Sequence, residues 1–302
     1  MRSRRPISTA ARFAAASNTG SMSPTNLLED DALPEYDRPP VVEVALATQF
    51  LPIPTLTAAH VGVFWGKLRS RFPSVEQQPA VAPTIESERG SPSPSVIFQF
   101  STASTLPRTL FLSSDRAQML QLQSDTLIHN WRKQTSDPAE YPRYPSIRKA
   151  FEEDLLAFAE FLRSDLSAEL ALQQVEITYI NHIAREDVWQ THAEPEKVVK
   201  ILATDPVPPE LAAAEDTQVH ARRLLRSSNG TFLGRLHIDL QPAFRLPGME
   251  PIFVLTLTAR GAPLSADAGG VLGFLDLGRQ AIVRGFTALT TDAMHTAWGR
   301  RR

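Results

Sequence analysis

Two spacings of apolar residues recur along the chain, and together they limit the folds open to it. Between residues 147 and 162 the apolar side chains are separated by 4, 4, 3 and 4 positions, the period of a helix with one buried side. Between residues 232 and 240 apolar and polar residues alternate, as in a β-strand with one buried face. A chain with both periods is expected to form an α+β protein in which long amphipathic helices pack on sheets. The apolar positions of the two segments are Ile147, Phe151, Leu155, Phe158 and Leu162, and Phe232, Leu236, Ile238 and Leu240.

The expected elements begin with a strand at residues 41–50, which alternate after Pro39-Pro40. A helix is expected from Thr57 until Pro73 ends it, and the Pro-rich residues 79–94 are expected to be mostly loop. Polar turn residues then separate a series of short strands, which indicates an antiparallel meander before the helix of residues 147–162. These strands are residues 96–101, 108–113, 117–123 and 126–132.

A similar order of elements follows in the second part of the chain. Gly269-Gly270 opens a long C-terminal helix, and Trp298 is expected to be its last packing residue. We therefore predict two related α+β halves, residues 33–168 and 169–302, each a mainly antiparallel sheet packed by a long helix. The elements expected before the C-terminal helix are strands at residues 175–183, 218–226, 232–240 and 252–260 and a short helix at residues 196–203.

Composition excludes several classes of protein. The chain has no cysteine, which rules out disulfides, thiolate metal centres and cysteine nucleophiles and fits a cytoplasmic location. Hydrophobic residues make up 42% of the chain, enough for a sizeable core, but no apolar run approaches the roughly 18 residues of a membrane span. We therefore expect no contact with a membrane.

Charge is distributed unevenly between the N-terminal arm, residues 1–32, and the rest of the chain. Residues 1–21 carry four arginines and no acid, whereas the remainder has 27 basic and 33 acidic residues. Such a mildly acidic body argues against a dedicated nucleic-acid binder. The arm is expected to be disordered, and three interpretations of it stay open: a plain tail, an organellar targeting segment, or residues upstream of a true start at Met22.

Several stretches resemble a sporadically distributed bacterial family of uncharacterised proteins. The resemblance covers about residues 33–300 and lies in a Pro-Pro-Val-Val-Glu-Val start at residues 39–44, a Tyr-Ile-Asn-His-Ile strand at residues 179–183, and a C-terminal Leu-Thr-Thr, Met-His and Trp-Gly-Arg pattern from Leu289 to Arg300. It implies a bacterial, cytoplasmic protein and supplies no catalytic residues.

No assembled catalytic motif or cofactor fingerprint is present, and no cofactor is expected. Gly269-Gly270-x-x-Gly273 follows a polar loop and lacks the Lys-Ser/Thr of a phosphate-binding loop, so flexibility at a helix start explains it better. His237 and Asp239 share the polar face of one strand and, with His182 or His220, would offer metal ligands. A solvated sheet face is the favoured interpretation, and no metal site is predicted.

Four polar residues form a tentative pocket: Tyr179, Asn181, Arg260 and His237. Tyr179 and Asn181 share the apolar side of their strand, where a buried amide must find a partner in a neighbouring backbone or in a ligand. Arg260 ends a strand and is expected to pair with a carboxylate such as Asp239, or with an anionic ligand. Glu43 is expected on the solvent-facing or helix-facing side of its strand rather than in acid–base chemistry.

Three hypotheses for function follow. The leading one is a non-enzymatic interaction or regulatory protein that binds a protein partner or forms a homodimer, because apolar sheet faces and helices can also serve as partner-binding surfaces. The alternative is a small-ligand-binding protein or enzyme with a cavity between the two halves, lined by the tentative pocket residues. The third, nucleic-acid binding through residues 1–21 and 300–302, is disfavoured by the acidic body.

Overall fold

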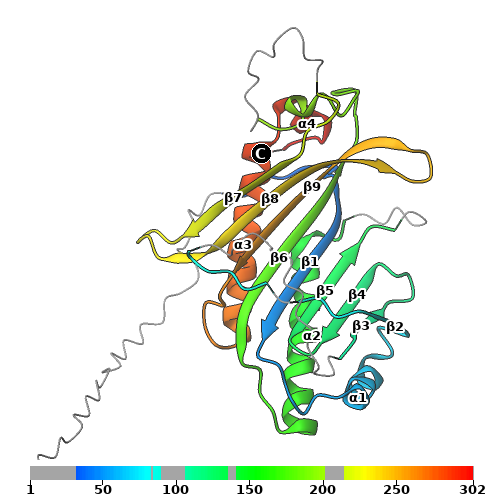
Figure 1. The fold of residues 1–302 in the computed structure, drawn as a ribbon, viewed down its shortest axis with the longest axis vertical. Helices are drawn as coiled ribbons and strands as arrows, with labels where there is room; N and C mark the ends of the chain where they lie inside the picture. The colour runs from blue at the N-terminus through cyan, green and yellow to red at the C-terminus, as the bar shows by residue number, and fades with distance from the viewer. Residues whose placement is uncertain (1–31, 83, 90–105, 135–140, 201–213, 302) are drawn as a thin grey trace, which may run out of the picture.

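A single nine-stranded antiparallel sheet forms the centre of the computed structural model, which describes residues 32–82, 84–89, 106–134, 141–200 and 214–301 (Figure 1). The strand order is β2-β3-β4-β5-β1-β6-β9-β8-β7, so β2 and β7 are the edges. The strands are β1 Val41–Phe50, β2 Ser74–Gln78, β3 Arg108–Leu112, β4 Gln118–Gln123, β5 Thr126–Arg132, β6 Leu172–Ile183, β7 Val219–Arg226, β8 Phe232–Arg245 and β9 Glu250–Gly261.

One face of the sheet is covered by helices, and the central strands β6 and β9 alternate and turn their apolar side chains toward that face. The long helices α2 (Arg143–Leu166) and α3 (Ala268–Leu289) lie behind the sheet in Figure 1, with the shorter α1 (Ala58–Leu68) beside α2. A three-residue 3-10 helix, η2 (Pro195–Lys197), and α4 (Asp292–Ala297) complete the described elements. None of the helices in the described part of the chain is long and apolar enough to cross a bilayer.

Close helix–sheet contact depends on Gly278, at the middle of α3. A β-carbon at this position would lie 2.6 Å from the Cγ2 atom of Ile177 and 3.1 Å from the Cβ atom of Ala259, on the adjacent strands β6 and β9. At the start of the same helix, the carboxylate of Asp267 accepts a hydrogen bond of 2.8 Å from the backbone N–H of Gly270. Gly269-Gly270 is therefore the capped first turn of a helix.

A buried ionic group links α2 to the sheet and to the end of α1. The carboxylate of Asp154 is 0% exposed and lies 2.7 Å from Nδ1 of His129 and 2.7 Å from Nη1 of Arg71. His129 is also buried, whereas the Arg71 side chain reaches the surface. Asp154 is three residues after Phe151 and four before Phe158, so it lies on the buried stripe of the helix.

Most expected elements are present at their expected places. The strands at 41–50, 108–113, 117–123, 126–132, 175–183, 218–226, 232–240 and 252–260 and the two long helices are confirmed within a few residues at their ends. Strand β2 was not expected, the expected helix at 196–203 is the 3-10 turn η2 as far as the described residues go, and the expected strand at 96–101 lies outside the described residues. Pairing of β1 with β6 makes one continuous sheet across the predicted boundary between residues 168 and 169.

Candidate functional site

A cavity of about 400 Å³ lies on the helix-covered side of the sheet. Its walls come from the segment before β1, the beginning of α2, the middle of α3, and strands β6 and β9. A volume of this size is within the range of pockets that hold small organic molecules. The residues that line it are Pro34, Glu35, Tyr36, Pro39, Pro40, Val41, Tyr141, Arg143, Tyr144, Pro145, Tyr179, Asn181, Leu257, Arg279, Ile282, Val283, Phe286 and Arg301.

All four tyrosines of the chain line this cavity, although they are scattered between residues 36 and 179 of the sequence. The hydroxyl of Tyr141 donates to that of Tyr179 at 3.2 Å. The hydroxyl of Tyr144 donates to Oδ1 of Asp276 at 2.7 Å, and that of Tyr36 contacts Oγ1 of Thr287 at 2.8 Å. The cavity, which we call the tyrosine cavity, is therefore walled by aromatic rings that carry oriented hydroxyl groups.

Burial keeps these phenols protonated. The pKa of each of the four tyrosines is raised above its ordinary value, chiefly because the anionic phenolate would lose its solvation. At Tyr144 the negative charge of Asp276 raises the pKa further, and at Tyr179 the neighbouring Tyr141 does so. At neutral pH the tyrosines present neutral O–H groups to the cavity.

A positive charge faces the same space. The guanidinium of Arg279, on α3, lies over the ring of Tyr144 at 4.9 Å and acts electrostatically on Tyr141, Tyr144 and Tyr179. Among the residues that the structure describes, no carboxylate lies within ion-pair distance of this guanidinium. The lining also holds Arg143 and Arg301 against a single acid, Glu35, so the described wall is net positive.

The structure divides the tentative pocket into two pairs on opposite faces of the sheet. Tyr179 and Asn181 line the tyrosine cavity. The Asn181 amide donates to the backbone oxygen of Leu255 at 3.0 Å, so its hydrogen-bond partner is a neighbouring backbone, one of the two alternatives expected from the sequence. Arg260 and His237 project from the other face, because neighbouring residues of a strand alternate between faces. The prediction that these four residues form one pocket is therefore wrong.

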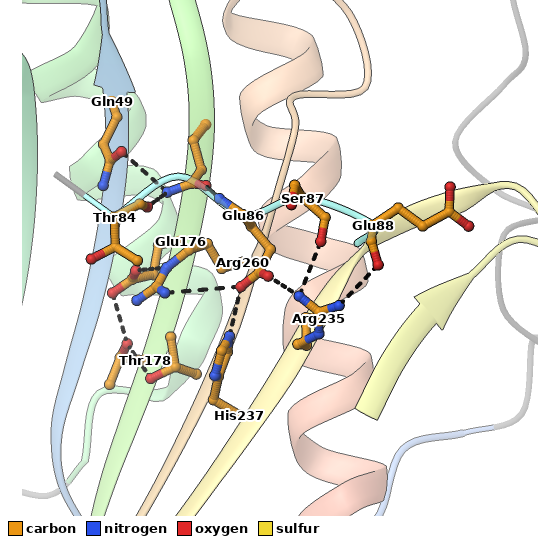
Figure 2. A network of polar contacts seen from close by, with 12 residues as sticks. Gln49, Thr84, Glu86, Ser87, Glu88, Glu176, Thr178, Arg235, His237 and Arg260 are labelled. Carbon is orange, nitrogen blue, oxygen red and sulfur yellow. Dashed lines mark hydrogen bonds and ion pairs between the residues drawn. The ribbon is translucent and has the colours of Figure 1, made fainter. Parts of the chain in front are cut away.

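On that other face a short segment of chain crosses the sheet. We call it the strap, residues 80–82 and 84–89, and Figure 1 shows it in cyan in front of the strands. The side chain of Glu86 is only 2% exposed and is enclosed by Arg235, His237 and Arg260 (Figure 2). Nη1 of Arg235 donates to Oε1 of Glu86, Nε2 of His237 lies 2.7 Å from Oε2, and Nη1 of Arg260 is 4.0 Å from Oε2. The strap thus places one carboxylate in a basic cluster formed by β8 and β9.

Two glutamines hold the strap's backbone. Gln123, on β4, accepts from the N–H of Val81 at 3.2 Å and donates to its carbonyl at 2.9 Å. Gln174, on β6, accepts from the N–H of Glu86 at 2.6 Å and donates to the carbonyl of Thr84 at 2.5 Å. Each side-chain amide therefore makes the pair of hydrogen bonds that the backbone of a neighbouring strand would make.

The other polar residues singled out in the sequence have local partners. Arg260 does pair with a carboxylate, but this is Glu176, at 2.5 Å, rather than Asp239. Asp239 instead contacts Nδ1 of His220 at 2.5 Å. No group of three metal-ligating side chains occurs among the described residues.

Glu43 and Trp298, near the two ends of the described part of the chain, were also singled out in the sequence. Glu43 lies on the face opposite the helices and contacts Asn130 and Arg132, at 2.6 and 2.9 Å. Trp298 is buried against Phe286, although it follows α4 rather than ending α3. Residues 1–21 lie outside the described residues.

Neither the sequence pattern nor any motif indicated the tyrosine cavity as a whole or the role of Glu86. Of the cavity residues, Tyr179 and Asn181 were found because they share the apolar parity of β6. Comparisons with models of protein families, with curated proteins and with solved structures returned no match.

Proposed function

We propose that the protein binds a small anionic molecule with an aromatic or other flat apolar part in the tyrosine cavity. One observation carries the proposal: every tyrosine of the chain lines a single cavity that also receives the guanidinium of Arg279. An arginine without a carboxylate partner among the described residues is suited to a ligand carboxylate or phosphate. The rings offer stacking surface, and their hydroxyls offer donors that fix the orientation of the ligand.

The position of the cavity fits the idea of two related halves. The strand order β3-β4-β5-β1 on one side of the β1–β6 junction corresponds to β7-β8-β9-β6 on the other. In each half the last of three consecutive strands pairs with the first strand, and a long helix follows. The cavity takes lining residues from both sides of the boundary at residue 168, which supports a ligand site shared by two halves.

The test is a thermal-shift titration of the full chain with phenyl phosphate and 4-hydroxybenzoate as anionic probes and benzyl alcohol as a neutral one. A ligand at about 100 times its Kd stabilises the native state by about 2.7 kcal/mol. For a chain of this size that corresponds to a rise in Tm of roughly 5–10 °C. We expect a rise with an anionic probe and little change with the neutral one.

Two arginine variants localise the effect. Arg279→Met removes the charge from the cavity and is expected to abolish the rise caused by the anion. Arg163→Met, on the exposed side of α2, changes the same residue type away from the cavity and is expected to leave the rise intact. Equal shifts in the two variants, or no shift with any probe, would refute the proposal.

A second candidate, an interaction protein, is favoured by the turn between β8 and β9. Phe244, at the end of β8, and Leu246 and Met249, in the turn itself, are all more than half exposed, with Leu246 at 73%. Exposed apolar groups gathered on one projecting hairpin are a frequent feature of partner surfaces. Replacing Leu246 by Ser is expected to lower the native mass if the hairpin joins two copies; an unchanged mass and no lost partner in a pull-down would contradict this candidate.

A further inference from the structure

The strap is held to the sheet almost entirely by polar contacts. Its two larger apolar side chains stay exposed, Val81 at 55% and Ile85 at 49%. Only the carboxylate of Glu86 is buried, and the backbone is bound by Gln123 and Gln174. A segment that buries so little apolar surface contributes little hydrophobic free energy to its own attachment.

The contacts follow a pattern suited to recognising a peptide. Glutamine amides bind backbone N–H and C=O groups that every residue type possesses, so they recognise an extended chain without regard to its sequence. The basic cluster then selects one side chain, a carboxylate, at a fixed place along that chain. Arg235 adds two backbone contacts, donating to the carbonyls of Ser87 at 3.1 Å and Glu88 at 3.3 Å (Figure 2).

The charges continue toward the edge of the sheet. Beyond the Glu86 site, Arg226 on the edge strand β7 contacts the carboxylate of Glu88 at 2.9 Å. Two acidic residues at positions i and i+2 of an extended segment therefore meet two successive basic sites on β8–β9 and β7. The complementary ligand is an extended peptide with a Glu-x-Glu pattern.

We propose that this face of the sheet is a binding groove for an extended acidic peptide of a partner protein, and that the strap occupies the groove in cis as an autoinhibitory segment. The partner would present its own glutamate to Arg235, His237 and Arg260 and would displace the strap. This site is on the opposite face from the tyrosine cavity, so the proposal does not depend on ligand binding there.

The first experiment opens the groove with Glu86→Gln, which keeps the size of the side chain but removes the charge that Arg235 and Arg260 bind. The probe is a fluorescent synthetic peptide of residues 79–89, added to the full-length protein while anisotropy is measured. We expect binding to the variant, and binding to the wild type that is weaker by about tenfold or more, because the wild-type strap competes. Glu76→Gln, on the edge strand β2, is the matched control: its side chain is 44% exposed and pairs with Arg116 outside the strap, so this variant is expected to behave like the wild type.

Peptide and protein controls identify the carboxylate as the recognised group. A peptide with Gln in place of Glu86 is expected to bind the opened variant about tenfold more weakly, and adding Arg235→Met to that variant is expected to abolish binding of the Glu peptide. Equal binding of the two peptides, or no binding to the opened variant, would overturn the proposal. Concentration-dependent dimers of the opened variant would show that a second copy, rather than a partner protein, fits the groove.

A measurement on the wild type does not rely on any variant folding. Hydrogen–deuterium exchange is expected to show that the amides of Val81 and Glu86 exchange through local opening, much faster than those of β6 and β9. If these strap amides are protected as strongly as the central strands, the strap is a permanent part of the fold and the autoinhibitory role is wrong.

Discussion

Raising the pH above 10 should unfold the protein in a single step that all four tyrosines report. The reason is that every tyrosine of the chain lines the tyrosine cavity, and burial raises the pKa of each above that of a tyrosine in an unfolded chain. The native state therefore binds more protons than the unfolded state once the pH exceeds 10. Stability that is fully present below that pH is lost as the pH rises toward the native pKa values.

The size of the effect follows from the number of buried phenols. Each group whose native pKa is raised costs about 1.4 kcal/mol of stability per pH unit above the unfolded pKa. Tyr144 and Tyr179, whose pKa values burial raises furthest, together give a loss of about 3 kcal/mol at one pH unit above 10. Tyr36 and Tyr141, whose pKa values are raised less, are left out of this sum. A loss of about 3 kcal/mol is a large part of the stability of many domains, about 5–15 kcal/mol.

The assay records phenolate absorbance and far-ultraviolet circular dichroism in parallel between pH 8 and 12. We expect the two signals to change together, without a separate phenolate titration centred near pH 10. Tyr179→Phe, which removes one of the four tyrosines, should reduce the absorbance change by about a quarter while the two signals stay coincident. If half of the phenolate signal develops near pH 10 while the circular dichroism is still native, the tyrosines are not enclosed as described.

Two further predictions concern stability. Asp154→Asn breaks a buried ion pair, which should cost about 2–4 kcal/mol and lower Tm by roughly 5–10 °C. Asp165→Asn breaks a solvent-accessible pair on the same helix and should leave Tm within about 1 °C of the wild type. Equal shifts of the two variants in scanning calorimetry would contradict the burial of the Asp154 ion pair. Gly278→Ala should destabilise by about 1–2 kcal/mol despite the better helix propensity of alanine, because its methyl group would overlap Ile177. The control is Gly66→Ala, in α1 with open space around it, which should be neutral or stabilising by up to about 1 kcal/mol in urea unfolding. If Gly278→Ala is also stabilised, α3 does not pack against β6 as closely as described.

The periodic spacing of apolar residues was enough to determine the class of fold, most of the elements and the face to which each strand turns its apolar residues. In β6 the alternation correctly placed Tyr179 and Asn181 on the buried side. The same rule, applied to β8 and β9, puts His237 and Arg260 on the opposite side from their apolar neighbours, so the division of the tentative pocket was present in the sequence.

Only the tertiary structure decided which strands join and which distant side chains meet. Alternation fixes a side chain's face within one strand but carries no information on strand order, so the pairing of β1 with β6 could not be derived from it. The gathering of the four tyrosines depends on that pairing and on where α2 and α3 cross the sheet. The burial of Glu86 in an otherwise exposed loop has no periodic signal at all, because its partners lie about 150 residues later in the chain and contact it only after the sheet has formed.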